Sequence, residues 1–174
     1  MILSRFVPLV LGVLLVLGLG GSALAQKPPA KCGPDHAILY KRAVKLLDNA
    51  EKKLTAGYTA EAKSQVKEAN SLFTILHKEC GPQQAERPLT DKELQQEAIN
   101  QKLAADELAQ AERLIKSAEE KQQKAVKIET TQPDLYVKYQ REAKLEFEQA
   151  HKRSIKSELY ALRNQQMVFG FLGK

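Results

Sequence analysis

The longest helical signal in the chain lies in residues 89–134, LTDKELQQEAINQKLAADELAQAERLIKSAEEKQQKAVKIETTQPD. Thr90 is followed three residues later by Glu93, the spacing of a capping box, and Leu89 and Leu94 stand where a hydrophobic staple packs. No glycine or proline interrupts the stretch before its second-to-last residue. The pattern predicts a helix of roughly 40 residues, which spans about 60 Å at a rise of 1.5 Å per residue.

Small and apolar residues recur along this helix mostly three or four positions apart, which is the rhythm of a coiled-coil seam. Alanine is the commonest residue of the seam, and this favours close approach of a second helix. The predicted seam consists of Leu94, Ala98, Gln101, Ala104, Leu108, Ala111, Ile115, Ala118, Gln122 and Ala125.

A further helix is predicted after the break TTQPD, because Thr131 and Pro133 both favour the start of a helix. It is expected to run from about residue 134 to residue 167, antiparallel to the helix before it. Its predicted apolar side consists of Tyr136, Tyr139, Ala143, Phe147, Ala150, Ile155, Leu159 and Leu162. Residues 86–174 are therefore predicted to form a long, coiled-coil-like helical hairpin.

A shorter helical hairpin is predicted in residues 26–85. Pro34 suits the first turn of a helix, and Gly57 supplies its stop because glycine adopts the left-handed cap conformation without strain. Thr59 is predicted to cap the next helix, which is expected to end at Cys80-Gly81-Pro82. Helices joined by so short a turn pack as antiparallel neighbours.

These patterns together predict an all-α fold of four helices, arranged as two antiparallel helical hairpins behind an N-terminal signal peptide. Because the hairpins differ in length, part of the long one is expected to project as an unsupported antiparallel coiled coil. The predicted division is a signal peptide over 1–25, a disulfide-stapled short hairpin over 26–85, and a long hairpin with an apolar C-terminal tail over 86–174.

The N-terminus has the three parts of a secretory signal peptide. Arg5 precedes an apolar run over residues 6–19, and Ala23-Leu24-Ala25 gives the small-x-small pattern of a cleavage site. The run is shorter than the ~20 apolar residues of a membrane span, and an uncleaved anchor is the alternative. Cleavage near Ala25 would leave a periplasmic or secreted protein that begins near Gln26.

The formal net charge of the chain is +6, and its acidic and basic side chains are interleaved. A mild basic excess favours contact with an anionic surface. It is too weak and too evenly mixed with acids for nucleic-acid binding, and the secretory signal also argues against a nucleic-acid partner.

The two cysteines, Cys32 and Cys80, stand at the two ends of the short hairpin. Antiparallel helices bring these ends together, so an exported chain is predicted to join them in a disulfide. The alternative is a metal site. His36 and His77 complete a C-x3-H and H-x2-C pattern, and with the two cysteines they would supply the four ligands of a Cys2His2 zinc site.

Signatures of catalysis are missing from the sequence. There is no G-x-S-x-G, no H-E-x-x-H, no glycine-rich phosphate loop and no C-x-x-C-H for covalent haem. The protein is therefore predicted not to be an enzyme and to need no cofactor.

Two groups of residues near the C-terminus are candidate partner-binding surfaces. One is a basic cluster, with a solvated helix face as the alternative: His151, Lys152, Arg153, Lys156 and Arg163. The other is the apolar tail, with folding back onto the bundle as the alternative: Met167, Val168, Phe169, Phe171 and Leu172. An exposed apolar segment of this kind indicates a protein partner, a membrane or self-association.

Residues 46–72 resemble the helix–turn–helix of a tetratricopeptide-type hairpin, through Ala50, Leu54, Gly57-Tyr58 and Ala62. The resemblance covers one hairpin, and no 34-residue repeat follows it. A signal followed by basic, coiled-coil-like helices is also similar in outline to periplasmic holdase chaperones. Neither likeness assigns the chain to a family.

The sequence as a whole predicts an exported, non-enzymatic interaction or scaffolding protein of the bacterial cell envelope, with a chaperone-like role as a variant. Its expected partner is an envelope protein or a second copy of the chain. The alternative is a ligand- or metal-binding protein that uses the Cys32, His36, His77 and Cys80 end of the short hairpin.

Overall fold

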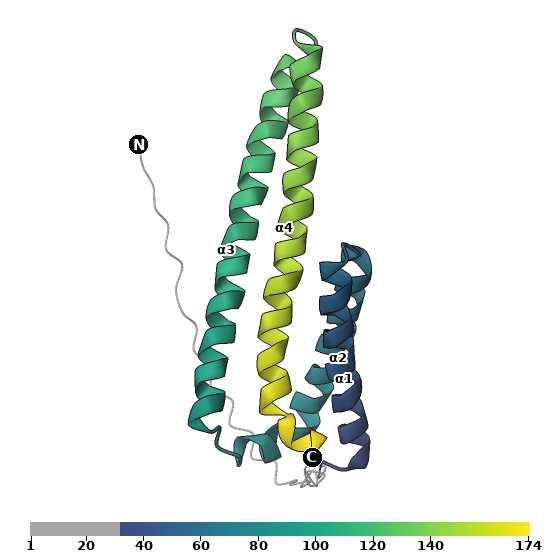
Figure 1. Cartoon of the computed structure of the whole chain (residues 1–174), viewed down its shortest axis with the longest axis vertical. Helices are drawn as coiled ribbons and strands as arrows, with labels where there is room; N and C mark the ends of the chain where they lie inside the picture. The colour runs from purple at the N-terminus through teal and green to yellow at the C-terminus, as the bar shows by residue number, and fades with distance from the viewer. Residues whose placement is uncertain (1–31) are drawn as a thin grey trace, which may run out of the picture.

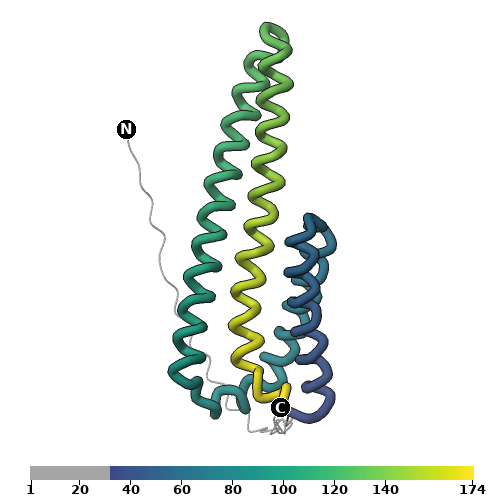
Figure 2. The backbone as a smooth tube through the Cα atoms, in the orientation of Figure 1, coloured from purple at the N-terminus to yellow at the C-terminus, as the bar shows by residue number. Residues whose placement is uncertain are grey.

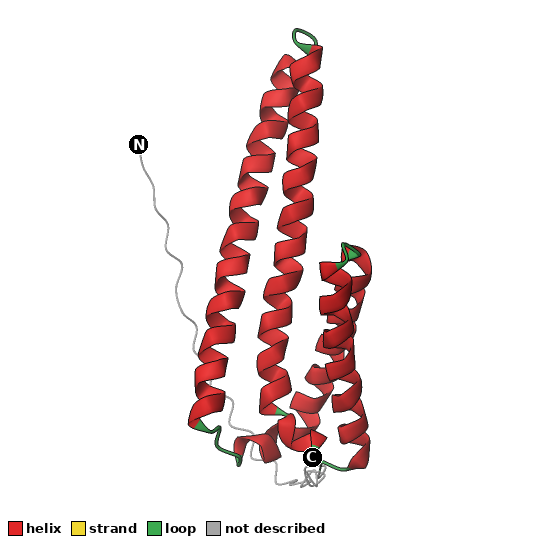
Figure 3. Ribbon diagram, viewed as in Figure 1, coloured by secondary structure: helices red, strands yellow, loops and turns green. Residues whose placement is uncertain are grey.

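The computed structural model describes residues 32–174, which form helices and contain no strand (Figure 3). The predicted signal peptide over residues 1–25 lies outside the described residues. The elements, in chain order, are α1 (Pro34–Thr55), α2 (Thr59–Ala85), α3 (Asp91–Ile128), α4 (Pro133–Val168) and the short 3-10 helix η1 (Gly170–Gly173). The prediction of four helices and an all-helical chain is confirmed for this part of the protein.

The helices pair as two hairpins, α1 with α2 and α3 with α4 (Figure 1). Helix α4 lies between α3 and the α1–α2 hairpin, and it contacts both. Among the described helices, α3 packs along α4 alone. No helix between residues 32 and 174 combines the length and apolar character that a membrane span needs.

The turn between α1 and α2 depends on Gly57, whose φ of 87° lies in the left-handed region. The backbone N–H of Tyr58 donates to the carbonyl of Lys53 at 2.9 Å, and the N–H of Gly57 donates to that of Leu54 at 3.3 Å. This pair of bonds is a Schellman motif. Because so tight a turn ends at Tyr58, Thr59 is the first residue of α2 and not its cap, which corrects the prediction.

The predicted end of α2 at Cys80-Gly81-Pro82 is wrong, because the helix continues to Ala85 with Pro82 inside it. Gly57 is the one glycine of the described part with a positive φ, so Gly81 does not act as a left-handed cap. Pro82 lacks the N–H that would bond to the carbonyl of Lys78. The proline therefore removes one backbone hydrogen bond, and the helix continues for three residues beyond it.

Helix α3 begins as predicted. The N–H of Glu93 donates to the hydroxyl of Thr90 at 3.3 Å, and the N–H of Thr90 donates to the Glu93 carboxylate at 2.9 Å. Hydrogen bonds from the Thr90 backbone, the Arg87 side chain and the Thr90 hydroxyl lower the pKa of the Glu93 carboxyl to about 2. The capping box is therefore complete.

One apolar core joins α1, α2, the C-terminal part of α4 and the tail. Its buried members are Tyr40, Ala43, Leu47, Ala50, Leu54, Ala62, Val66, Ala69, Leu72, Phe73, Leu76, Cys80, Ile155, Leu159, Leu162, Phe169 and Leu172. No residue of α3 belongs to this core. The α4 residues that contribute to it lie from Ile155 onward, whereas the α3–α4 hairpin continues well past the α1–α2 turn (Figures 1 and 2).

The face of α3 against α4, here called the seam, differs from the predicted one. Its more protected positions repeat every seven residues in two rows: Ala104, Ala111, Ala118 and Ala125, and Asn100, Glu107, Leu114 and Lys121. The four alanines were predicted. Six other predicted members are exposed: Leu94, Ala98, Gln101, Leu108, Ile115 and Gln122.

Polar seam residues hold these positions because α4 supplies their partners. The amide of Asn100 donates to Asn164 at 2.8 Å, and Ser157 donates to the carbonyl of Ala104 at 2.7 Å. Lys121 donates to Glu146 at 2.6 Å. At every second seam position, the predicted residue therefore lies one position after the residue that the structure protects.

The left-handed turn predicts opposite effects for two alanine substitutions. Gly57→Ala should lower the free energy of unfolding by about 1–2 kcal/mol, because an L-residue is strained at a positive φ. Gly81→Ala is the matched control and should leave stability unchanged or raised, since its Cβ would meet only His77 at 3.6 Å and alanine favours a helix. Urea denaturation followed by circular dichroism measures both, and equal effects would contradict the assignment of the cap.

Candidate functional site

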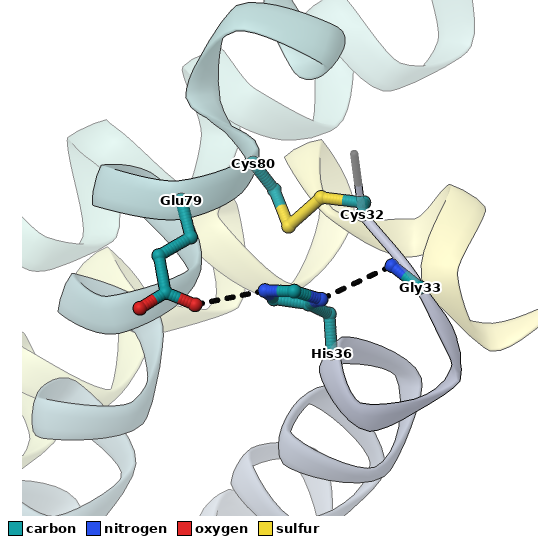
Figure 4. The surroundings of a disulfide bond; sticks show 5 residues. All are labelled: Cys32, Gly33, His36, Glu79 and Cys80. Atoms are coloured by element: carbon teal, nitrogen blue, oxygen red, sulfur yellow. Dashed lines mark hydrogen bonds and ion pairs between the residues drawn. A yellow bond between two sulfur atoms is a disulfide. The ribbon is translucent and has the colours of Figure 1, made fainter. Parts of the chain in front are cut away.

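The Cys32–Cys80 disulfide closes the open end of the short hairpin (Figure 4). The two Cα atoms are 5.5 Å apart and 48 residues apart in sequence, and Cys80 is 1% exposed. A cross-link over a loop of this length stabilises the fold by about 4 kcal/mol in the chain-entropy model. The disulfide is compatible with an extracytoplasmic location.

His36 is held between the two ends of the short hairpin (Figure 4). Its Nδ1 accepts the backbone N–H of Gly33 at 3.1 Å, so it caps the first turn of α1. Its Nε2 lies 2.8 Å from a carboxylate oxygen of Glu79 at the end of α2. Since Nδ1 accepts and the carboxylate has no proton to give, the ring proton is on Nε2 and donates to Glu79.

His77 does not join the predicted four-ligand set. The ligand atoms of Cys32, His36 and Cys80 all lie within 4.8 Å of one another, and His77 is not among them. Its ring instead meets the ring of Phe169 edge-on, with centroids 6.0 Å apart. Because the tail packs on this side of α2, the structure brings together three of the four predicted ligands.

The apolar tail folds back onto the bundle. Phe169 is fully buried and Leu172 is 8% exposed, while Val168 and Phe171 pack against the same core. A Cβ on Gly173 would lie 2.9 Å from the ring of Tyr40, so the end of the chain touches α1 closely. Of the tail residues predicted to bind a partner, Phe169 and Leu172 face the core of this chain, and Met167, Val168 and Phe171 are half-buried.

Three residues of the basic cluster on α4 form ion pairs with acidic residues of the same chain. Arg153 and Lys156 donate to the two carboxylate oxygens of Glu107 on α3 at 2.8 and 2.6 Å. Arg163 donates to Asp48 and Glu51 on α1, at 2.9 and 2.8 Å, on the other side of α4.

The two remaining members of the basic cluster are His151 and Lys152. His151 is half-buried, and Lys152 is exposed at a cleft of about 300 Å³ between the end of α1 and α4. The cluster therefore contacts both neighbours of α4, and Lys152 is an exposed cation at this cleft.

The α4 partners of Glu107 favour the charged form of its carboxyl. Burial by itself would raise its pKa, but the hydrogen bonds and charges of Lys156 and Arg153 outweigh it and hold the pKa below the ordinary value. The hydrogen bond to Glu107 likewise raises the pKa of Lys156. Further along the seam, Lys121 lowers the pKa of Glu146 through their hydrogen bond.

Neither the Glu79 contact nor the seam ion pairs were predicted from the sequence. A signal was present in the alternation of the seam, where Asn100, Glu107 and Lys121 fall seven or fourteen residues apart between alanines. Because these three side chains are polar, a pattern read from apolar residues assigns them to the surface. Comparison of the chain with protein-family models, with curated proteins and with solved structures found no match in any of the three.

The buried tail predicts a large effect of Phe169→Ala. Removing a fully buried phenylalanine should lower the free energy of unfolding by about 3–5 kcal/mol. Phe171→Ala is the control, because the ring it removes is half-buried and should matter less. Equal and small effects of the two changes on the urea midpoint would contradict the packing of the tail.

The seam carboxylate predicts a pH-dependent effect of Glu107→Gln. A carboxyl with a lowered folded pKa stabilises the fold above its unfolded pKa of about 4.3, and this stabilisation is lost as the pH falls through the folded value. The substitution should therefore lower the free energy of unfolding by about 1–2 kcal/mol near neutral pH. The difference from the unsubstituted chain should shrink progressively in acid.

Glu112→Gln is the matched control for this change, because Glu112 lies on the exposed face of the same helix. It should show little difference from the unsubstituted chain at any pH. A constant effect of Glu107→Gln from neutral to acid pH would contradict the ionic role of Glu107.

Proposed function

We propose that the chain is an exported, non-enzymatic interaction protein of the bacterial cell envelope, and that it self-associates through one side of the α3–α4 hairpin. The signal-peptide pattern of residues 1–25 and the Cys32–Cys80 disulfide support export. The observation that carries the proposal is a row of exposed apolar side chains on this hairpin. The seven-residue repeat of the seam supports coiled-coil packing of the α3–α4 hairpin.

This row, here called the stripe, consists of Leu108, Ile115 and Val126 on α3 and Val137 on α4, with exposed fractions of 47%, 39%, 66% and 54%. Each of the four directly follows a more protected residue. On two antiparallel helices, the residues that follow seam positions point to the same flank, since the helices face each other and run in opposite directions. The stripe therefore lies on one side of the hairpin, and exposed apolar side chains gathered on one side favour association.

Charges beside the stripe favour a second copy of the chain as the partner. Glu119 and Lys144 are exposed, and each follows a buried alanine of the seam, on α3 and α4 respectively. Lys121 lies 3.3 Å from Glu142 across the seam, so Glu119 and Lys144 stand at about the same height. A two-fold axis along the helices would lay α3 of one copy on α4 of the other and place each Glu119 opposite a Lys144.

The proposed pair is thus a bundle of four long helices with the stripes at its centre. Burial of the stripe would supply the affinity, since apolar area removed from water is the main driving force of association. The Glu119 and Lys144 pairs would contribute little energy at the surface but would fix which helix faces which.

The stripe predicts that Leu108→Lys combined with Ile115→Lys weakens self-association about tenfold or more, because both charges would be buried in the pair. Analytical ultracentrifugation over a range of concentrations measures the dissociation constant. Ile38→Lys is the matched control, since Ile38 is 63% exposed on α1 and away from the stripe. A chain that stays monomeric at all concentrations, or that associates equally well with the double substitution, would refute the proposed surface.

The orientation of the pair is tested by a charge exchange. Glu119→Lys and Lys144→Glu should each weaken association by opposing like charges, and the two changes together should restore it. Additive weakening in the double variant would exclude this two-fold arrangement while leaving the stripe itself in place.

A further inference from the structure

The disulfide-linked end of the short hairpin brings together side chains of the kinds that zinc prefers as ligands. Cys32 precedes α1, His36 is in its first turn, and Cys80 is near the end of α2, with their ligand atoms all within 4.8 Å of one another. Thiolate sulfur and imidazole nitrogen are the usual zinc ligands in proteins. The disulfide holds the two sulfurs together, and Glu79 holds the ring of His36 from the side of α2.

We propose that reduction of the Cys32–Cys80 disulfide turns this end of the hairpin into a site for one Zn²⁺ ion, bound by the two cysteine sulfurs and by Nδ1 of His36. Nδ1 is the ring nitrogen that carries a free electron pair for the metal, because the ring proton is on Nε2. The hydrogen bond that Nδ1 accepts from Gly33 is given up when the metal binds. The set differs from a Cys2His2 site, since His77 is turned toward Phe169.

Glu79 supplies the outer support that such a site needs. Its carboxylate accepts the Nε2–H of His36 at 2.8 Å, so it fixes both the tautomer and the orientation of the ring (Figure 4). Carboxylate–histidine–zinc arrangements of this kind strengthen the histidine as a ligand. Glu79 keeps this role in the metal-bound form, and the fourth position of a tetrahedral ion is left for water or an added ligand.

The disulfide and the metal exclude each other. A dithiol reductant gives two electrons and two protons to the disulfide, which becomes two thiols while the reductant becomes a disulfide. Each cysteine then releases one proton as its thiolate binds Zn²⁺, and neutral His36 binds without releasing one. The site therefore links metal occupancy to the redox state of its surroundings.

This site is separate from the surface proposed for self-association. It lies at the disulfide-linked end of the α1–α2 hairpin, opposite the Gly57 turn, whereas the stripe lies on the α3–α4 hairpin. Either proposal can fail without the other, because the experiment for one measures metal binding and the experiment for the other measures the oligomeric state.

The test uses the mature chain reduced with a phosphine, which takes up oxygen from water as it converts the disulfide to two thiols. Titration with Co²⁺ as a spectroscopic stand-in should give one tetrahedral thiolate-bound ion per chain, and Zn²⁺ should displace it. The oxidised chain should bind neither. No saturable binding by the reduced chain, or loss of its helical circular-dichroism signal on reduction, would overturn the proposal.

Variants of the reduced chain assign the ligands. Cys32→Ser and His36→Ala should abolish the tetrahedral spectrum, and Glu79→Gln should weaken Zn²⁺ binding about 10–100-fold, as expected for an outer-shell partner. His77→Gln is the matched control, because it removes the other histidine of this end and should leave the affinity unchanged. Unchanged affinity in His36→Ala, or loss of binding in His77→Gln, would overturn this ligand set.

Discussion

The fold depends on the burial of two faces of a single helix, α4. On one face of α4, Ile155, Leu159 and Leu162 are buried in the core that α4 shares with α1 and α2. The opposite face meets α3 through small residues such as Ala143 and Ala150. Because α3 packs on α4 alone among the described helices, the long hairpin packs on the short one through α4 and the tail that follows it. Helix α4 is therefore the element on which both hairpins rely.

Polar contacts complete this arrangement where apolar packing alone would be ambiguous. An alanine seam permits close approach, but equal small residues repeated every seven positions also allow neighbouring registers. In the observed register Asn100 pairs with Asn164, and Glu107 pairs with Arg153 and Lys156. Unpaired polar groups in a shifted seam would be costly, so these contacts specify the register more than they add to stability.

Signals that act within a few residues could be predicted. The Thr90–Glu93 capping box and the glycine stop at Gly57 each depend on hydrogen bonds between near neighbours, and both are present. The predicted seam failed at alternate positions for the opposite reason. Whether Glu107 or Leu108 is buried depends on which side chains α4 presents, and the pattern of apolar residues in α3 does not contain that information.

The sequence by itself determined the number of helices, the turn at Gly57 and the meeting of Cys32 and Cys80, because helix periodicity, a glycine cap and antiparallel return are properties of contiguous chain. Only the tertiary structure decided that the tail enters the core and that His77 meets Phe169 instead of the cysteines. Those outcomes depend on the burial of surfaces far apart in the chain. Hydrophobic burial is non-directional, so its partners become defined only when the helices are packed.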